Sequence, residues 1–128
     1  PRLRVLDFTR EVSLYMDASD ILFTKPGGLS SSEALACRIP TVHTAPIPGC
    51  ESDNFRFFTK KGCSLGAKNI NQQIECGLRL MDSPELRTEM RVAQAKCAKP
   101  YASLDIFKLI EKHQKKDDAE KKAEASIG

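Results

Sequence analysis

Short apolar runs alternate with amphipathic segments along most of the chain. The runs Leu3–Phe8, Ile21–Thr24 and Thr41–Ala45 have the length and composition of β-strands, and residues 62–67 form a weaker one. Ile21–Thr24 is apolar throughout, which is typical of a strand buried on both faces. Helices are expected over residues 10–18, 30–37, 51–61, 69–81 and 83–99, with a last helix beginning near residue 103. This alternation predicts an α/β fold, a Rossmann-like parallel sheet flanked by helices.

One stretch, Ile21–Leu35, combines a strand, a Gly-Gly turn and a helix start. Gly27 and Gly28 lack a Cβ, so the backbone can turn sharply and approach a ligand closely. Ser30–Ser32 are expected near the N-cap of the helix, whose unpaired N–H groups and partial positive charge suit a phosphate. Glu33, one turn later, could accept a hydrogen bond from a sugar hydroxyl. The stretch indicates a nucleotide-phosphate cradle, although many Gly-Gly-x-Ser turns bind nothing.

A second loop, Pro46–Cys50, follows the next predicted strand. Loops at the carboxyl ends of adjacent parallel strands face one cleft, so both loops are expected to share a ligand. Lys25 is a candidate phosphate partner, the alternative being a solvated loop lysine. Glu51 and Asn54 could bind sugar hydroxyls, the alternative being that they cap the following helix.

Length and charge limit the other interpretations. The 128 residues are enough for one domain, placed at residues 1–114, and the highly charged segment 115–128 is expected to be a frayed helix or a disordered tail. A net charge of +3 is too small to indicate nucleic acid but is compatible with an anionic membrane surface. The absence of Trp and 6% aromatic residues also disfavour a base-stacking protein. A first residue of Pro rather than Met suggests a piece of a longer protein.

The cysteines and histidines offer little catalytic chemistry. Five cysteines without a Cys-x-x-Cys pair disfavour a zinc site or a dithiol redox site, and free thiols in a reducing cytosol are expected. His43 could serve as a base, but its place inside a predicted buried strand favours a structural role. No metal site is expected.

Four segments resemble one known family. Val5–Thr9, Ala18–Leu35, Ile39–Val42 and Pro46–Asn54 are similar to the donor-binding half of monogalactosyldiacylglycerol synthases and processive diacylglycerol glucosyltransferases, which are related to the bacterial lipid II N-acetylglucosaminyltransferase. The resemblance covers about residues 3–110. It implies a GT-B glycosyltransferase, in which two Rossmann-like domains enclose the active site, with this chain as the C-terminal half.

The resemblance also implies roles for individual residues. The backbone near Phe8 and Thr9 would read uracil, the helix-start amides would hold the diphosphate, and Glu33 would bind the ribose. Glu51 and Asn54 would contact the donor sugar or its phosphate. The implied nucleotide-sugar-binding residues are Phe8, Thr9, Lys25, Gly27, Gly28, Leu29, Ser30, Glu33, Pro48, Gly49, Cys50, Glu51 and Asn54.

The implied function is that of an inverting hexosyltransferase, which moves a hexose from a UDP-sugar to a diacylglycerol-type lipid without a cofactor or metal. The catalytic base and the acceptor site would belong to the missing N-terminal domain, so the chain alone is expected to bind UDP weakly and to be inactive. A cytoplasmic location is expected, with peripheral attachment at the inner face of the membrane. The sequence departs from the family at Cys50, where Gln is usual, and at Asp7, where Gly is frequent.

Three other functions fit parts of the pattern. One is the donor-binding subunit of a two-chain N-acetylglucosaminyltransferase, and another is a non-catalytic phosphosugar-binding domain. The third, a nucleotide-sugar 2-epimerase, lacks a counterpart to the loop that begins at Pro46. The first differs from a single-chain enzyme only in where the acceptor half is encoded.

Overall fold

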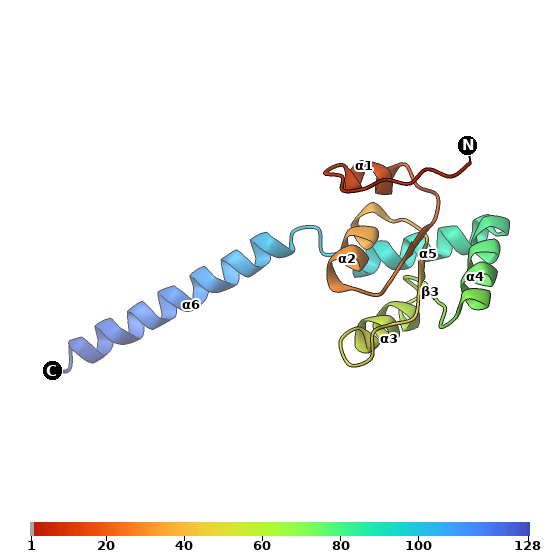
Figure 1. Cartoon of the computed structure of the whole chain (residues 1–128). Coiled ribbons are helices and arrows are strands. Elements are labelled where there is room, and N and C mark those ends of the chain that lie inside the picture. The colour runs from red at the N-terminus through yellow and green to blue at the C-terminus, as the bar shows by residue number, and fades with distance from the viewer. Residues whose placement is uncertain (1) are drawn as a thin grey trace. The chain divides into compact units, whose positions relative to one another are not determined.

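Three short parallel strands form the centre of the first of two units, which ends at Ala98. They stand in the order β1 (Leu22–Thr24), β2 (Thr41–His43) and β3 (Leu65–Gly66). The computed structural model describes residues 2–128, and the remaining helices of this unit are α1 (Val12–Asp17), α2 (Gly28–Cys37), α3 (Ser52–Lys60), α4 (Ile70–Asp82) and α5 (Pro84–Cys97) (Figure 1). Parallel strands joined through helices confirm the predicted α/β fold.

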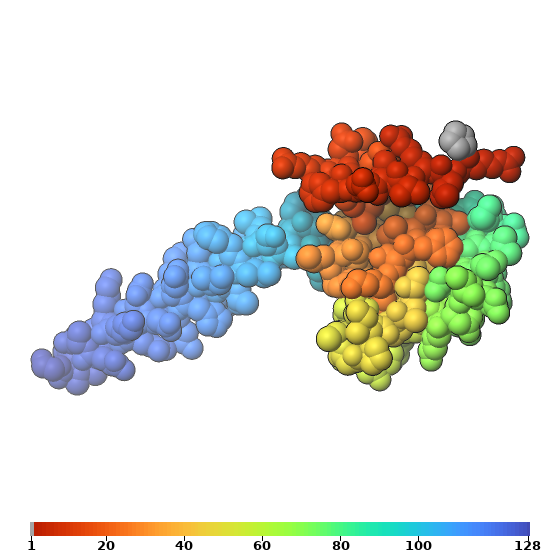
Figure 2. Space-filling model, in the orientation of Figure 1, coloured from red at the N-terminus to blue at the C-terminus, as the bar shows by residue number. Residues whose placement is uncertain are grey.

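The core lies where the sheet meets α4 and α5. Val42, Leu80 and Met90 are at most 2% exposed and pack together, and a second buried cluster joins Leu35 to Phe58. On another side of the unit, residues 2–20 (red) extend across α2, which α1 contacts (Figure 2). The sheet is therefore held mainly by apolar contacts from helices on its faces.

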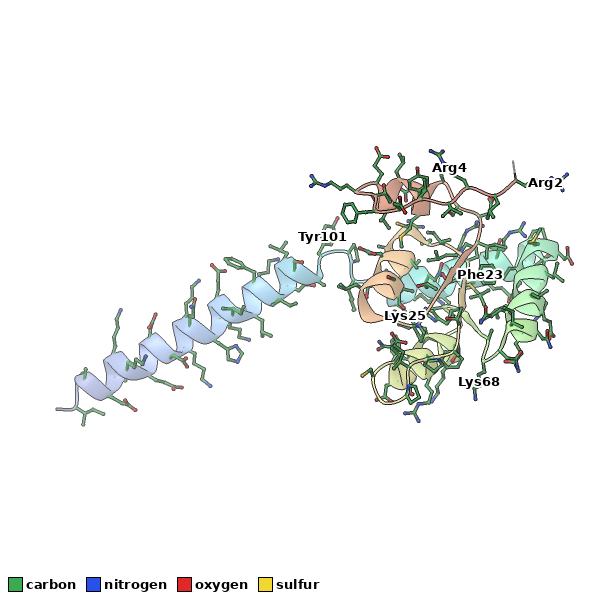
Figure 3. The ribbon with its side chains drawn as sticks, in the orientation of Figure 1. Arg2, Arg4, Phe23, Lys25, Lys68 and Tyr101 are labelled. Carbon is green, nitrogen blue, oxygen red and sulfur yellow. The ribbon has the colours of Figure 1, made fainter. Side chains whose placement is uncertain are left out.

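One predicted strand does not form, and another is less buried than expected. Leu3–Phe8 forms neither strand nor helix, and Phe8 is 88% exposed. A strand needs a partner for its backbone hydrogen bonds, and none of β1, β2 or β3 pairs with this segment. β1 is also not buried on both faces: it is an outer strand of the sheet, and Phe23 is 48% exposed (Figure 3 labels it).

The starts of α4 and α5 are confirmed in atomic detail. The side chain of Asn69 accepts a hydrogen bond from the amide of Gln72 at 2.9 Å, and Ser83 accepts one from Leu86 at 3.1 Å. Pro84 occupies the first position of α5, where its missing N–H costs nothing. These caps fix the direction in which each helix leaves its loop.

The second unit, Lys99–Gly128, consists mainly of one helix, α6 (Ala102–Ala125). Its backbone stays helical through the charged residues 115–125, and none of its residues is buried. Residues 115–125 thus continue α6, while the fraying of this segment and the domain limit at residue 114 stay predictions. No helix within residues 2–128 is long and apolar enough to cross a membrane.

Candidate functional site

The carboxyl ends of the three parallel strands bring three loops to one edge of the sheet. These are residues 25–27 after β1, residues 44–51 after β2 and residues 67–69 after β3. Open α/β sheets bind ligands at this edge, because the helices that follow the strands begin there. The first two loops are the pair that the sequence places in one cleft.

The N-terminus of α2 offers three backbone donors. The first intrahelical bond runs from the amide of Ser31 to the carbonyl of Gly27, at 3.1 Å. Within residues 2–128, the amides of Gly28, Leu29 and Ser30 have no hydrogen-bond partner, and no side chain caps the helix. Three unpaired N–H groups at the positive end of a ten-residue helix can bind an anion.

The serines expected near the N-cap of this helix do not themselves cap it. The N-cap is Gly27, and Ser30–Ser32 lie inside the helix. Ser31 is buried and bonds to His43, while the hydroxyl of Ser32 donates to the carbonyl of Gly28 at 2.7 Å. The helix begins at Gly28, earlier than the expected residue 30.

The turn itself does not demand glycine. Gly27 has φ −73°, and the positive-φ glycines of the described chain are Gly49 and Gly62. A Cβ on Gly28 would meet no atom within 4 Å. What Gly28 provides is therefore open space beside the unpaired amides, not a special backbone conformation.

Lys25 and Glu51 form an ion pair between the two loops. The Lys25 ammonium lies 3.1 Å from Oε1 of Glu51, and Oε2 accepts a 2.9 Å hydrogen bond from the amide of Ile47. The hydrogen bond from Ile47 lowers the pKa of Glu51 most, and Lys25 lowers it further, while burial acts in the opposite direction. The pKa of Glu51 is lowered on balance, so the side chain is a carboxylate. Lys25 is thus already paired with a carboxylate in the absence of ligand.

A second contact joins the same loops. The side-chain amide of Asn54, in the first turn of α3, donates to the carbonyl of Pro26 at 3.1 Å. Glu51 occupies the N-cap position of α3, but neither its side chain nor that of Asn54 makes a capping hydrogen bond to the helix. Pro48 and Cys50 are exposed at the tip of the second loop, and Gly49 has φ +84°.

His43 is enclosed between serines. Its Nε2 lies 3.0 Å from the hydroxyl of Ser31 and its Nδ1 lies 2.8 Å from that of Ser64, while the residue is 1% exposed. Burial lowers the pKa of His43 to about 4, so the ring is neutral at pH 7. The structural role expected for His43 is confirmed, since both ring nitrogens are occupied inside the fold.

In the part of the chain that the structure describes, three expected site residues make no hydrogen bond or ion pair with the two loops. Phe8 is fully open, and Thr9 uses its hydroxyl to accept a bond from the amide of Glu11 at 3.1 Å. Glu33 is exposed and lines a small cavity of about 130 Å³ beside Met16 of α1. Within residues 2–128, no hydrogen bond or ion pair joins these three residues to the two loops.

The third loop adds a residue that the sequence did not single out. Lys68 stands two residues after β3, and its exposed side chain comes from the same edge of the sheet as Lys25, which directly follows β1 (Figure 3). Its amide donates to Gln72, which fixes the backbone. The sequence signal that could have found Lys68 is a charged residue just after a short predicted strand.

A larger hollow of about 590 Å³, beside Asp82 and Ser83, lies at the other end of α4.

Comparison with known proteins relates the chain to lipid glycosyltransferases, although no protein-family model matches it. It is 31% identical over 104 residues to the processive diacylglycerol beta-glucosyltransferase of Staphylococcus saprophyticus, a match covering 81% of this chain and 27% of the relative. The enzyme of the same name from Staphylococcus epidermidis is 30% identical over 108 residues, with 84% and 28% covered. The chain thus spans just over a quarter of these relatives.

A solved structure supports the fold. The crystal structure of MurG from Acinetobacter baumannii matches with a TM-score of 0.70 at 22% identity, over 85% of this chain and 33% of that one. This agreement shows that the α/β arrangement is the GT-B fold of that structure.

Proposed function

We propose, from its distant homology to the processive diacylglycerol β-glucosyltransferases, that this chain is the donor-binding part of a hexosyltransferase. The donor is a UDP-hexose, held at the carboxyl edge of the sheet. The acceptor is a diacylglycerol-type lipid, bound by a part of the protein beyond this chain. The homology and the GT-B fold support this assignment.

The observation that carries the proposal is the set of unpaired amides at Gly28, Leu29 and Ser30. A diphosphate has several acceptor oxygens and negative charge, and both suit the start of a helix. Lys25 and Lys68 add cationic groups at the same edge. The open space at Gly28 lets the phosphate come close to the backbone.

The chemistry follows from this geometry. Transfer of the hexose leaves UDP as the departing group, on which negative charge grows as the glycosidic bond to phosphate breaks. Fixed N–H dipoles stabilise that charge without having to reorganise during the reaction. The proposed mechanism inverts the configuration at the anomeric carbon of the sugar, and the catalytic base lies outside these residues. The chain alone therefore binds the donor and does not turn it over.

The cellular setting is part of the same proposal. We propose that the complete protein is cytoplasmic and attaches peripherally at the inner face of the membrane, where a diacylglycerol acceptor would reside. The net charge of +3 is compatible with anionic lipid headgroups.

Calorimetric titration tests the proposal. The 128-residue chain should bind UDP and UDP-glucose and should bind ADP more weakly. Glu33→Ala should weaken UDP binding, because the variant loses the proposed ribose contact. UDP-galactose and UDP-N-acetylglucosamine in the same series identify the sugar, and selective binding of the latter would favour the two-chain enzyme. Equal or absent binding of UDP and ADP would refute a uridine-nucleotide site.

A further inference from the structure

We propose that Glu51 is a positioning residue, which acts with Lys25 to hold the Pro46–Cys50 loop against the phosphate cradle, and is not itself a ligand of the donor sugar. The inference rests on the proposed function, since it concerns how that site selects its sugar. It replaces the direct contact that the family resemblance assigns to Glu51.

The carboxylate of Glu51 is occupied inside the protein. Oε1 is 3.1 Å from Lys25 and Oε2 is 2.9 Å from the amide of Ile47, and the residue is 6% exposed. A sugar hydroxyl needs an acceptor that it can reach from the cleft. An acceptor this deeply enclosed holds protein groups in place more readily than it meets a ligand.

The bonds of Glu51 close its own loop. The Ile47 amide donates to the Glu51 side chain, and the Glu51 amide donates back to the Ile47 carbonyl at 3.1 Å. The turn thus has a bond at each side, with Gly49 in the left-handed region between them. Such a turn keeps the exposed residues Pro48 and Cys50 in one place, so they can present a fixed surface to a sugar.

Lys25 connects that turn to the cradle. It lies between β1 and α2, only three residues before Gly28, and its ammonium reaches the enclosed carboxylate of Glu51. The bond from Asn54 to the Pro26 carbonyl runs in parallel. Because one partner of the ion pair is buried, breaking it should cost more than breaking an exposed surface pair.

The test uses the sugar increment, defined as the Kd of UDP divided by the Kd of UDP-glucose. A change of charge near the phosphates affects both ligands alike and cancels in this ratio. Lys25→Met, Glu51→Gln and the double variant are titrated with both ligands. The matched controls are Lys116→Met and Glu120→Gln, which break a pair of the same residue types at 3.9 Å on α6.

The Lys25–Glu51 pair, called the clamp below, predicts that Lys25→Met and Glu51→Gln each reduce the increment by roughly threefold to tenfold, and that the double variant reduces it no further. The controls should leave it unchanged. In an amide-resolved spectrum, Glu51→Gln should retain the Ile47 hydrogen bond, because a glutamine oxygen also accepts it.

Several results would overturn the clamp. If Glu51 contacts the sugar directly, Glu51→Gln should reduce the sugar increment and Lys25→Met should leave it unchanged. A wild-type increment of one would show that the loop does not sense the sugar, even though UDP binds. If Glu51→Gln fails to fold, the exposed Lys25→Met still decides between the two. Failure of UDP itself to bind would instead refute the proposed function.

Discussion

The hydroxyl of Ser31 lies 3.0 Å from Nε2 of His43, which links the first turn of α2 to the central strand. Nδ1 of the same ring lies 2.8 Å from the hydroxyl of Ser64, beside β3. One buried imidazole thus joins the helix that begins at the proposed cradle to two strands of the sheet. The position of the unpaired amides depends on this chain of polar contacts.

This arrangement predicts a pH dependence of stability. Burial lowers the pKa of His43 to about 4 from an ordinary 6.5. Between those values the unfolded chain binds a proton that the folded chain does not, so stability falls as pH drops from about 6.5 to about 4. The loss should reach about 3 kcal/mol. Urea unfolding across that range measures it.

His43→Gln serves as the control, because it removes the titrating group and keeps polar atoms near both serines. The variant should be less stable at pH 7 and should lose the slope between pH 6.5 and 5. Carboxylates such as Glu51 contribute only at lower pH, since the pKa of Glu51 lies below its usual value. A slope that persists in His43→Gln would contradict the assignment.

Gly66 is required by packing. A Cβ there would lie 2.5 Å from Cζ of Phe55 and 2.8 Å from Cγ2 of Thr59. Gly66→Ala should therefore cost about 1–3 kcal/mol, through displacement of α3 from β3. Thermal unfolding measures the loss, and adding Phe55→Leu should recover part of it. An alanine variant as stable as the wild type would show that α3 moves freely.

Gly28 makes the opposite prediction. Its surroundings are open, and alanine is the better helix former by up to about 1 kcal/mol, so Gly28→Ala should not lower the melting temperature. The added methyl group lies beside the amides of the cradle and should weaken UDP binding. Measuring melting temperature and UDP affinity on the same sample separates fold from function. Unchanged affinity would place the phosphate elsewhere.

Cys50 should affect which sugar binds. It is exposed at the tip of the loop, and a thiol is a weak hydrogen-bond partner for a hydroxyl. Cys50→Gln should change the relative affinity for UDP-glucose and UDP-galactose, while UDP itself binds as before. Cys37→Ser, on α2, is a thiol control with no expected effect on that preference. Equal effects on UDP and both UDP-sugars would mean that the loop does not read the sugar.

Much of the fold could be predicted from local patterns. The helices expected over residues 69–81 and 83–99 form, and their caps, Asn69 and Ser83, are adjacent to them in sequence. Leu3–Phe8 has an equally good strand composition but does not form one, because strand formation depends on a partner for pairing. The exposure of Phe23 has the same cause: the neighbours of β1 in the sheet are not visible in its own sequence.

The location of the site in the fold could be predicted from the sequence, but the side-chain contacts within it could not. Topology brings the loops after β1 and β2 to one edge, and that part followed from alternation alone. The pairing of Lys25 with Glu51 could not be foreseen, since it depends on side-chain reach between segments far apart in sequence. The burial of Ser31 likewise depends on His43, in a different strand.

Donor binding at the start of α2 is tested most directly by an amide-resolved NMR titration of the ¹⁵N-labelled chain with UDP. The largest shifts should fall on Gly28, Leu29 and Ser30, since their N–H groups are unpaired and would each gain an acceptor. Gly62, which also lies in a turn, is the internal reference and should not move. Saturating UDP that leaves Gly27 to Glu33 unshifted would contradict the claim that this helix start binds the donor.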